Sequence, residues 1–438
     1  MINNKKKEDY MKKTEKLYGI VEGYENISFV LDGFQCIFFN TNLETKDSTI
    51  IPNNQGFILG HTIEKKYIYI YSGQNLKITN ELILNTWIYF ISRDPALETY
   101  KTICFKGGIL SKLFFQSSVI FEPTDTNETK VKFQSDSLTY PLQNEKIKGQ
   151  ISIHSIPNES MSIEGGNSIS IESTNLEIVF EEAKEIQSFS EILGYIQNMC
   201  QFMTFRHNVS FEEVILKDNN RHTIAECYIH YDHDYDTDKK LLSCITFNAL
   251  GKCVTNLLDT IVDNRPEKPQ FNIGFIPEND KKAAYISSMT IREVCSALES
   301  EMELTKIQIK QEKAFDELVK KLKNIVKEDR DVVHSLSDPK SYDYIFGTLR
   351  HMSGALADKI EKCFIEYQPL IGEYISRKQI DELVKYRNTI THGNFMPLNN
   401  ELAETTFILI KLVYCSILKR IGLEDNIVKD LFKKHIIS

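Results

Sequence analysis

The sequence predicts an α+β protein in which a β-rich N-terminal domain precedes an all-α C-terminal domain. Three observations lead to this prediction. Short runs that alternate apolar and polar residues, broken by turn residues, fill roughly the first 180 positions. A stretch with three prolines and a charged end, 263–280, then interrupts the pattern. Beyond it, apolar residues recur at helical spacing and no segment alternates like a strand.

Individual strands can be recognised in the N-terminal part. The segment 65–73 alternates tyrosine and isoleucine, and 25–40 is typical of a hairpin that turns at an Asp-Gly pair. The runs 151–156 and 168–173 alternate strictly on either side of a Gly-Gly-Asn turn. Many short strands with turns at this spacing predict a sandwich or a barrel.

The pattern becomes mixed after these strands. Apolar residues at helical spacing predict a helix over 190–205. Further strands are predicted near 209–217 and 223–231, and another helix at about 249–263. The N-terminal domain is therefore expected to contain some helices beside its sheet.

The proline-containing stretch 263–280 is predicted to be a linker, which gives an N-terminal domain at 1–274 and a C-terminal domain at 281–438. The C-terminal domain is predicted to be a bundle of four or five helices. Its helices are expected at 285–326, 341–367, 376–392 and 400–418.

Composition indicates a globular protein, with 42% hydrophobic and 26% charged residues in a chain of 438. The most apolar stretch, 406–418, is short and contains Lys411, whereas a membrane span needs roughly 20 apolar residues. We interpret it as a buried helix and expect no contact with a membrane. The basic N-terminus has no apolar segment behind it, so a secretory signal is not expected.

Cysteine usage indicates the cellular compartment, and the distribution of charge indicates which part of the chain could bind nucleic acid. The nine cysteines are scattered without a CxxC pair, which favours a reducing cytoplasm and small core residues over disulfides or catalysis. Net charge is −9, but 281–438 carries 25 basic and 23 acidic residues, so the remainder, with 27 basic and 38 acidic, has −11. Such an acidic front part is a poor binder of nucleic acid, whereas the rear part permits it.

The segment YRNTITHGN, 386–394, ends a predicted helix and carries three polar side chains close together. Arg387 continues the apolar face that begins at Ile380, and a buried guanidinium needs a partner. Asn388 and His392 are four residues apart and are therefore neighbours on the helix surface. Arg387 and His392 are about 140° apart around the axis. They converge only if the last turn tightens or a second molecule faces them.

Gly393 fits the residue after a helix end and Pro397 prevents continuation, so His392 is expected in the last turn. The carbonyl end of the helix favours a cationic imidazole there, while burial and Arg387 oppose it. An imidazole balanced in this way suits acid–base catalysis near neutral pH, and a fixed arginine suits a phosphodiester oxygen. A capping or surface histidine is the alternative, because an arginine and a histidine can take this spacing by chance.

An RNxxxH pattern at the end of a long helix in a C-terminal all-α domain resembles the HEPN (higher eukaryotes and prokaryotes nucleotide-binding) superfamily. A β-rich domain ahead of it resembles one branch in particular, the ApeA-like anti-phage defence proteins. The matching residues are LVKYRNTITHGN, 383–394, supported by the helix at 297–304 and by the segment 190–211 after the strands. The match is specific in the rear motif and rests on general layout in the front domain.

The resemblance implies an antiparallel HEPN bundle that forms a homodimer with its two motifs facing each other, and RNA cleavage that needs no metal or cofactor. It implies that Arg387 and His392 are catalytic and that Asn388 orients or binds the phosphate. The 2′-hydroxyl of the RNA would attack the adjacent phosphorus, and the products would carry cyclic phosphate and 5′-hydroxyl ends. The expected protein is a cytoplasmic prokaryotic RNA endonuclease, controlled by its N-terminal domain and activated by a phage-derived trigger.

Two other interpretations of the chain stay open. The helices could be a non-catalytic HEPN bundle that only dimerises or binds a nucleotide. Alternatively, the β domain could bind a ligand between the aromatic strands at 67–71 and 87–90, with the helices as a dimerisation handle, although these aromatics and Trp87 suit a core better. The usual phosphate-loop, dinucleotide, serine-hydrolase and zinc patterns are absent from the sequence.

Three smaller constellations have simpler interpretations than catalysis. HYDHDYDTD, 230–238, invites a metal, but as a calcium loop it lacks the required glycine and the closing glutamate, so an acidic turn is favoured. Arg330 with His334, like Arg350 with His351, could line an RNA groove but fits an exposed helix face better. Arg206 and His207, which follow a predicted helix end, are typical of a C-terminal cap.

Overall fold

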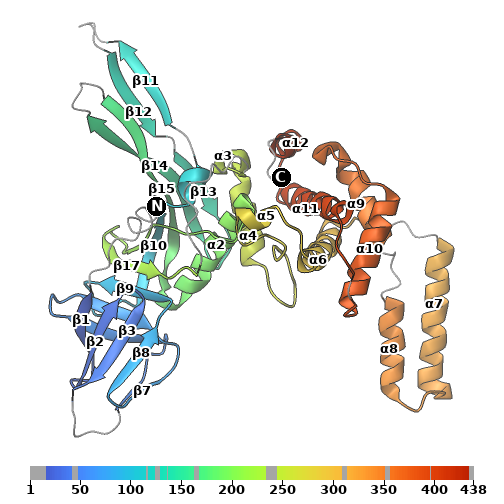
Figure 1. Cartoon of the computed structure of the whole chain (residues 1–438), viewed down its shortest axis with the longest axis horizontal. Coiled ribbons are helices and arrows are strands. Elements are labelled where there is room, and N and C mark those ends of the chain that lie inside the picture. The colour runs from blue at the N-terminus through green and yellow to red at the C-terminus, as the bar shows by residue number, and fades with distance from the viewer. Residues whose placement is uncertain are drawn as a thin grey trace. The chain divides into compact units, whose positions relative to one another are not determined.

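The computed structural model describes most of the chain, and Figure 1 shows it as a ribbon. The described residues are 16–41, 48–114, 117–123, 129–135, 137–161, 167–232, 244–307, 313–350, 356–394 and 396–433. They divide into two compact units, Met1–Val262 and Asp263–Ser438. The first unit is dominated by an antiparallel sheet and the second by helices, so the predicted α+β class is confirmed.

The first unit is built on a 13-stranded antiparallel sheet in the order β13-β14-β15-β10-β16-β17-β9-β6-β5-β1-β2-β3-β8. Among the described residues its hydrogen bonding is open, with β13 and β8 as the end strands. The structure thus shows one long sheet and not the sandwich or barrel that was predicted. The strands are β1 (Leu17–Val21), β2 (Ile27–Asp32), β3 (Gln35–Asn40), β5 (Phe57–Thr62), β6 (Tyr67–Tyr71), β8 (Glu81–Asn85), β9 (Ile88–Ser92), β10 (Thr99–Lys106), β13 (Ser137–Leu142), β14 (Gly149–Met161), β15 (Asn167–Glu185), β16 (Glu213–Lys217) and β17 (Thr223–Ile229).

Two short strand pairs accompany this sheet, namely β4 (Ser48–Ile50) with β7 (Leu76–Ile78), and β11 (Ser117–Pro123) with β12 (Thr129–Ser135). The strand β7 packs against β3 and β8. The strands predicted near 25–40, 65–73, 151–156 and 168–173 are all present, as are those predicted on either side of 220. Period-2 alternation therefore located these strands correctly.

One face of β1 to β9 encloses a hydrophobic core. Alternate residues of β2 and β3 point into it, including Phe29 and Phe38. Gly19 and Gly60 leave the space that the Phe29 ring occupies, because a Cβ atom on either would overlap that ring. The inner face of this half of the sheet is therefore fully packed.

The aromatic strands also contribute to a core. Tyr69 and Tyr89 are buried, and Tyr89 stacks on Tyr228 at 4.7 Å between ring centroids. Trp87, in contrast, was expected in the core and is 38% exposed, with its ring edge-on to Tyr71. It immediately precedes β9, in which the buried run begins only at Ile88.

The helices of the first unit lie between or after its strands. The helix predicted over 190–205 is α2 (Phe189–Thr204), and the one predicted over 249–263 is two helices separated at Gly251, which has a φ of +52°. The backbone N–H of Arg206 donates to the carbonyl of Gln201 at 3.3 Å and closes the end of α2. The remaining helices are α1 (Leu110–Leu113), α3 (Phe247–Leu250) and α4 (Cys253–Val262).

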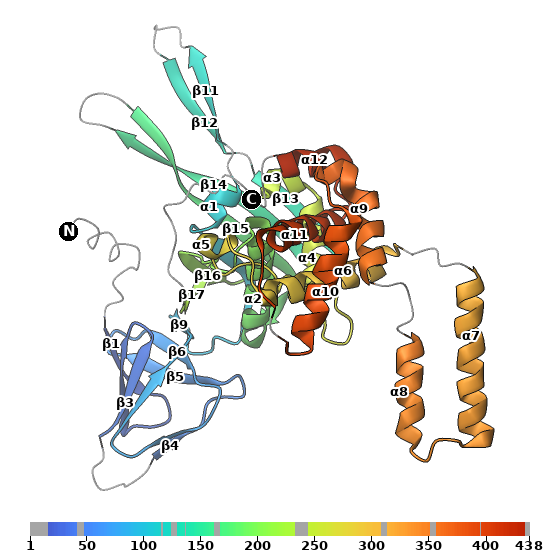
Figure 2. The same cartoon turned by 45° about the vertical axis from the view of Figure 1, so that its right-hand side comes forward.

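The second unit contains a five-helix bundle in the part of the chain described here. Its central helix is α11 (Asn400–Arg420), which contacts the other four, and α10 and α11 lie side by side in both views (Figures 1 and 2). The other members are α6 (Ser288–Thr305), α9 (Leu356–Ile371), α10 (Arg377–Thr391) and α12 (Asp425–Lys433). The interpretation of 406–418 as a buried helix is confirmed. A search of the described helices for one that could cross a membrane found none.

Two further helices, α7 (Lys313–Glu328) and α8 (Pro339–Arg350), pack against each other. Each of the long helices predicted at 285–326 and 341–367 is thus represented by two helices. Helix α6 ends where Lys306 takes a φ of +56°, and the residues 308–312 and 351–355 lie outside the described part of the chain. A short helix, α5 (Asp280–Ala283), precedes α6, and the sequence pattern predicted neither it nor α12.

The segment predicted as a linker, 263–280, belongs to the second unit, so the units divide at Val262/Asp263, earlier than the predicted boundary at 274. Phe271 and Phe275 are buried, and the Phe275 ring is edge-on to Tyr414. The prolines suggested an exposed tether, but the aromatic residues between them anchor the segment to the helices.

Candidate functional site

The predicted site lies at the C-terminal end of α10, and the start of this helix is firmly fixed. Ser376 caps it, and the Ser376 and Gln379 side chains each accept a hydrogen bond from the other's backbone N–H, at 3.3 and 2.8 Å. Arg377 forms ion pairs with three carboxylates, those of Asp358, Glu361 and Asp381, at 2.6–3.0 Å. The cap defines where α10 begins, and two of the three ion pairs connect this end of the helix to α9.

The end of α10 is set by its backbone. His392 is the first residue after the helix, and Gly393 follows with a φ of +77°, a conformation that favours glycine. The N–H of Asn394 donates to the carbonyl of Thr389 at 3.2 Å. This bond satisfies one of the last carbonyl groups of the helix, which have no partner within it. The prediction that Gly393 ends the helix is confirmed, and it places His392 at the terminus.

The buried face of α10 differs from the predicted one. Its buried residues are Ile380, Leu383 and Tyr386, whereas Arg387 is only partly buried. The Tyr386 hydroxyl lies 3.0 Å from the Ser288 hydroxyl on α6. The expectation that Arg387 extends the apolar face is therefore wrong, because Tyr386 takes that position and turns Arg387 to the margin of the bundle.

Arg387 nevertheless has the partners that a half-buried guanidinium needs. Its Nη1 donates to Asn388 Oδ1 at 3.1 Å, and its Nη2 lies 3.7 Å from Glu299 Oε2 on α6. Glu299 also pairs with Lys359 Nζ at 3.7 Å. The Arg387 side chain remains 31% exposed. It is thus oriented by an acid from another helix and still reachable from solvent.

Burial of the neighbouring Cys295 raises the pKa of its thiol to about 12, and the nearby Arg387 opposes that shift. Eight of the nine cysteines are buried, so the expectation that they are core residues is confirmed for those eight, and Cys244 is partly exposed. A thiol with a raised pKa carries little thiolate at neutral pH and is a poor nucleophile. Cys295 therefore belongs to the packing behind the site.

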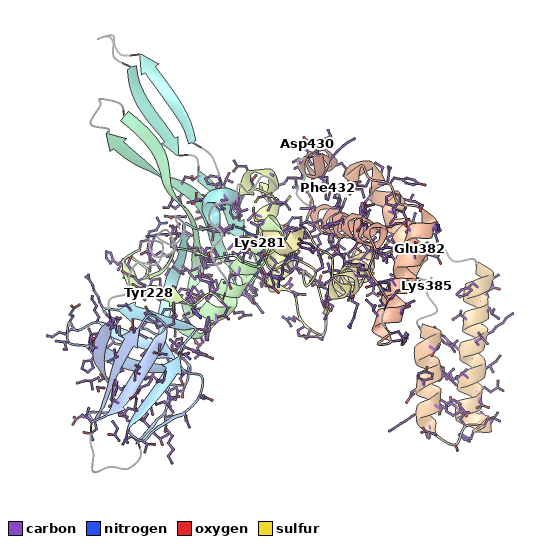
Figure 3. The ribbon with its side chains drawn as sticks, in the orientation of Figure 1. Tyr228, Lys281, Glu382, Lys385, Asp430 and Phe432 are labelled. Atoms are coloured by element: carbon purple, nitrogen blue, oxygen red, sulfur yellow. The ribbon has the colours of Figure 1, made fainter. Side chains whose placement is uncertain are left out.

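His392 and Asn388 are both exposed. Because His392 is exposed, its predicted burial is wrong. Within the described part of the chain, its imidazole makes no hydrogen bond or ion pair. The structure brings Arg387 and Asn388 into direct contact and leaves His392 facing solvent at the helix end. The exposed side of α10 also carries Lys385, labelled in Figure 3 together with Glu382.

The other constellations gain little support as sites. His230 Nε2 lies 3.2 Å from Asp232 Oδ1, but the rest of the 230–238 cluster falls outside the described residues. Among the residues that are described, no group of three or more potential ligands could hold a metal. Arg330 pairs with Asp331 and lies over the ring of Phe346 at 5.2 Å.

The remaining residues of these constellations are exposed or not described. His334 is exposed and takes a φ of +54° where a short π-helix, Asp329–Val333, ends. The Arg350 side chain and His351 lie outside the described residues. These positions therefore keep their simpler interpretation as parts of a helix face.

No protein-family model, no curated protein and no solved structure matches this chain.

Proposed function

We propose that this chain is a metal-independent RNA endonuclease of the HEPN type, acting as a homodimer in prokaryotic anti-phage defence. The observation that carries the proposal is the arrangement at the end of α10. An oriented arginine, an asparagine bonded to it and an exposed histidine lie on the last turns of one well-anchored helix. All three are accessible to a polymer too large to enter a buried pocket.

The chemistry follows from the three side chains. The RNA 2′-oxygen bonds to the adjacent phosphorus as the bond from phosphorus to the 5′-oxygen breaks. His392 takes the proton of the 2′-hydroxyl or gives a proton to the leaving 5′-oxygen. Arg387 stabilises negative charge that develops on the phosphoryl oxygens, because a planar guanidinium can donate two parallel hydrogen bonds. Asn388 orients Arg387 and can also donate to the phosphate. Glu299 keeps the guanidinium in place without covering it.

A dimer supplies what one copy lacks. Residues five positions apart on a helix lie about 140° apart around its axis, so Arg387 and His392 of one chain do not face a single phosphate. Two copies of α10 that meet at their C-terminal ends would place the arginine of one opposite the histidine of the other. The proposed active site is therefore shared between two copies of the bundle.

The decisive experiment is cleavage of total cellular RNA by the purified full-length protein in EDTA. We expect cutting to continue in the chelator and to leave cyclic phosphate and 5′-hydroxyl ends, which identify attack by the 2′-hydroxyl. His334→Ala is the matched control for a substitution of His392, because His334 is another exposed histidine at the end of a helix. Loss of cutting in His334→Ala, or cutting that stops in EDTA, would contradict the proposed site.

The first unit is proposed to restrain the nuclease until a phage-derived trigger arrives. Its part of the chain carries the acidic excess, which disfavours approach of RNA. We expect a fragment of residues 263–438 to cut RNA or arrest growth at least several-fold more strongly than the full chain. The fragment must begin at Asp263, because the segment before α6 is part of the second unit. Equal activity in a folded fragment would contradict the restraint.

The two rival functions have less to support them. The aromatic strands β6 and β9 bury Tyr69 and Tyr89, so these rings are not available to line an open ligand site. A non-catalytic helical bundle does not require an exposed histidine on the same helix end as an oriented arginine. This alternative predicts that substitution of neither residue changes RNA cleavage. The proposed cytoplasmic location and the absence of a cofactor follow from the nuclease proposal.

A further inference from the structure

In the described part of the chain, the end strand β8 is paired along one edge and not along the other. It pairs only with β3 in the sheet order, and Leu82 and Leu84 point toward the hydrophobic core of the first unit. The three alternate residues, Glu81, Ile83 and Asn85, are exposed, and Ile83 is 52% exposed. A half-exposed isoleucine at the centre of an end strand is the kind of position that natural sheets usually protect.

The hydrogen bonds to β3 show which backbone groups face outward. The N–H of Thr86 donates to the carbonyl of Phe34, and the N–H of Asn40 donates to the carbonyl of Asn80, each at 2.9 Å. In an antiparallel pair such bonded positions recur at every second residue, so Leu82 and Leu84 also bond to β3. The N–H and C=O groups of Glu81, Ile83 and Asn85 therefore point to the open edge, and none bonds within the described residues.

The sequence of β8, ELILN, is self-complementary in antiparallel pairing. With a two-fold axis at Ile83, each Ile83 stands opposite its equivalent in the second strand. Leu82 then stands opposite Leu84, and Glu81 stands opposite Asn85. Apolar residues thus meet apolar residues on the core side, and a carboxylate meets an amide rather than a like charge.

Most devices that normally prevent such pairing are missing from β8, in which Glu81 is the single charged residue. It contains no proline and no lysine, and its register with β3 shows no bulge. The opposite end strand, β13, contains Pro141, which has no N–H to donate. Of the two ends of the sheet, only the β8 end therefore has the sequence of a pairing edge.

The outer face of the sheet fits the same arrangement. Tyr18, Val30, Ile37 and Ile83 are direct neighbours across β1, β2, β3 and β8. A second β8 paired on the two-fold axis would continue this apolar row into the partner's sheet. These cross-strand contacts add to the backbone hydrogen bonds that the edge gains.

We propose that β8 is an interface strand, through which the first units of two copies join their sheets in antiparallel register about Ile83. The proposal does not rest on the nuclease activity, because it concerns the other unit and a different surface. The partner is a second copy of this chain, as the self-complementary register requires, and the contact is isologous.

Cross-linking of the full chain tests the pairing. In a bonded antiparallel pair the two Cα atoms lie about 5.5 Å apart, within the range of a disulfide. We expect Ile83→Cys to form disulfide-linked dimers under mild oxidation at least several-fold more efficiently than Ile63→Cys. Ile63 is the matched control, an isoleucine that is 91% exposed in a turn of the same unit. Equal cross-linking of the two variants would overturn the proposal.

A mixing experiment tests the register. Glu81→Cys mixed with Asn85→Cys should give cross-linked dimers, whereas each variant alone should give few, because residue 81 stands opposite residue 85 and not opposite itself. Efficient cross-linking of Glu81→Cys with itself would overturn the register. Ile83→Lys places two ammonium groups at the axis and should abolish the cross-link between Glu81→Cys and Asn85→Cys, while Ile63→Lys should not. A cross-link that persists in the presence of Ile83→Lys would contradict the interface.

Discussion

Arg387→Ala is expected to lower the rate of RNA cleavage at saturating RNA by about 10²–10³-fold, because it removes the donor that stabilises the charged phosphoryl group. His392→Ala is expected to lower the rate by about 10²–10⁴-fold through loss of proton transfer. Arg387→Lys should not restore activity, because an ammonium cannot make the bidentate contact. Single-turnover cleavage of one labelled RNA measures all three variants.

The control for these variants is Lys359→Ala. Lys359 pairs with the same Glu299 as Arg387, so its loss disturbs the surroundings of the site without removing a reacting group. We expect cleavage within about threefold of wild type and unchanged thermal unfolding, since a partly exposed ion pair contributes about 0–1 kcal/mol. A large loss of activity in Lys359→Ala would show that position 387 acts through structure rather than chemistry.

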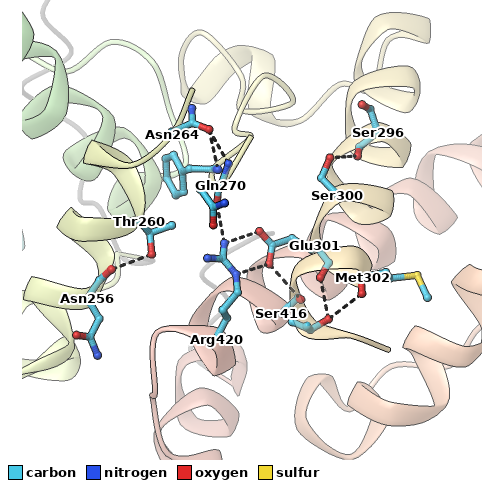
Figure 4. Close-up of polar contacts among 12 residues, drawn as sticks. Asn256, Thr260, Asn264, Gln270, Ser296, Ser300, Glu301, Met302, Ser416 and Arg420 are labelled. Atoms are coloured by element: carbon cyan, nitrogen blue, oxygen red, sulfur yellow. Dashed lines mark hydrogen bonds and ion pairs between the residues drawn. The ribbon is translucent and has the colours of Figure 1, made fainter. Parts of the chain in front are cut away.

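Arg420→Leu is expected to destabilise the helical unit by about 3–5 kcal/mol, the cost of leaving a buried charge without its partner. Glu301, whose side chain is 4% exposed, accepts hydrogen bonds from Arg420 Nη2 at 2.7 Å and Nε at 3.0 Å (Figure 4). Ser416 donates to the same carboxylate at 3.3 Å. Arg420 also donates to the carbonyl of Gln270 at 2.7 Å, and so fixes the segment before α6.

Urea unfolding of the full chain separates this effect from changes elsewhere. Trp87, the only tryptophan, reports on the first unit, while circular dichroism at 222 nm follows mainly the helices of the second. We expect Arg420→Leu to shift the dichroism transition and not the fluorescence transition. Lys419→Leu is the matched control, because Lys419 pairs with the exposed Asp425. A shift in Lys419→Leu as large as in Arg420→Leu would refute the argument.

The same variant has a predictable pH dependence. Burial raises the pKa of the Glu301 carboxyl above its ordinary value of 4.5, against the opposing effect of Arg420. A raised folded pKa means that the folded state holds the proton more tightly, so this group's contribution to stability is lost as pH rises through that pKa. The destabilisation by Arg420→Leu should therefore shrink as pH falls from 7 toward about 5, because protonation removes the unpaired charge. Glu301→Gln should abolish this dependence.

Local sequence pattern was enough to predict much of this molecule. Alternation located the strands, and a glycine followed by a proline four residues later was sufficient to place the end of α10 at Gly393. The features that the sequence did not predict depend on contacts between residues distant in sequence. Spacing did not identify Glu299 as the partner of Arg387. It also did not show that the Tyr386 side chain is buried and contacts Ser288 on another helix.

The two units divide at Val262/Asp263 rather than at the predicted 274 for a related reason. Three prolines in 263–280 are typical of a linker, and composition does not show that Phe271 and Phe275 are buried among the helices. Trp87 was misplaced because the buried run of β9 begins one residue later, at Ile88. In each case the deciding quantity was burial against a partner that the local sequence does not name.

The glycine after the helix has a consequence for finding relatives of this protein in genomes. At a φ of +77° any residue with a Cβ costs roughly 1 kcal/mol, and no neighbouring atom is close enough for that cost to be a clash. The cost comes from the backbone turn that presents His392, so it applies wherever the histidine is used in this way. A genome search for R-N-x-x-x-H-G, with glycine or asparagine in the last place, should therefore be more selective than a search for the arginine and the histidine alone.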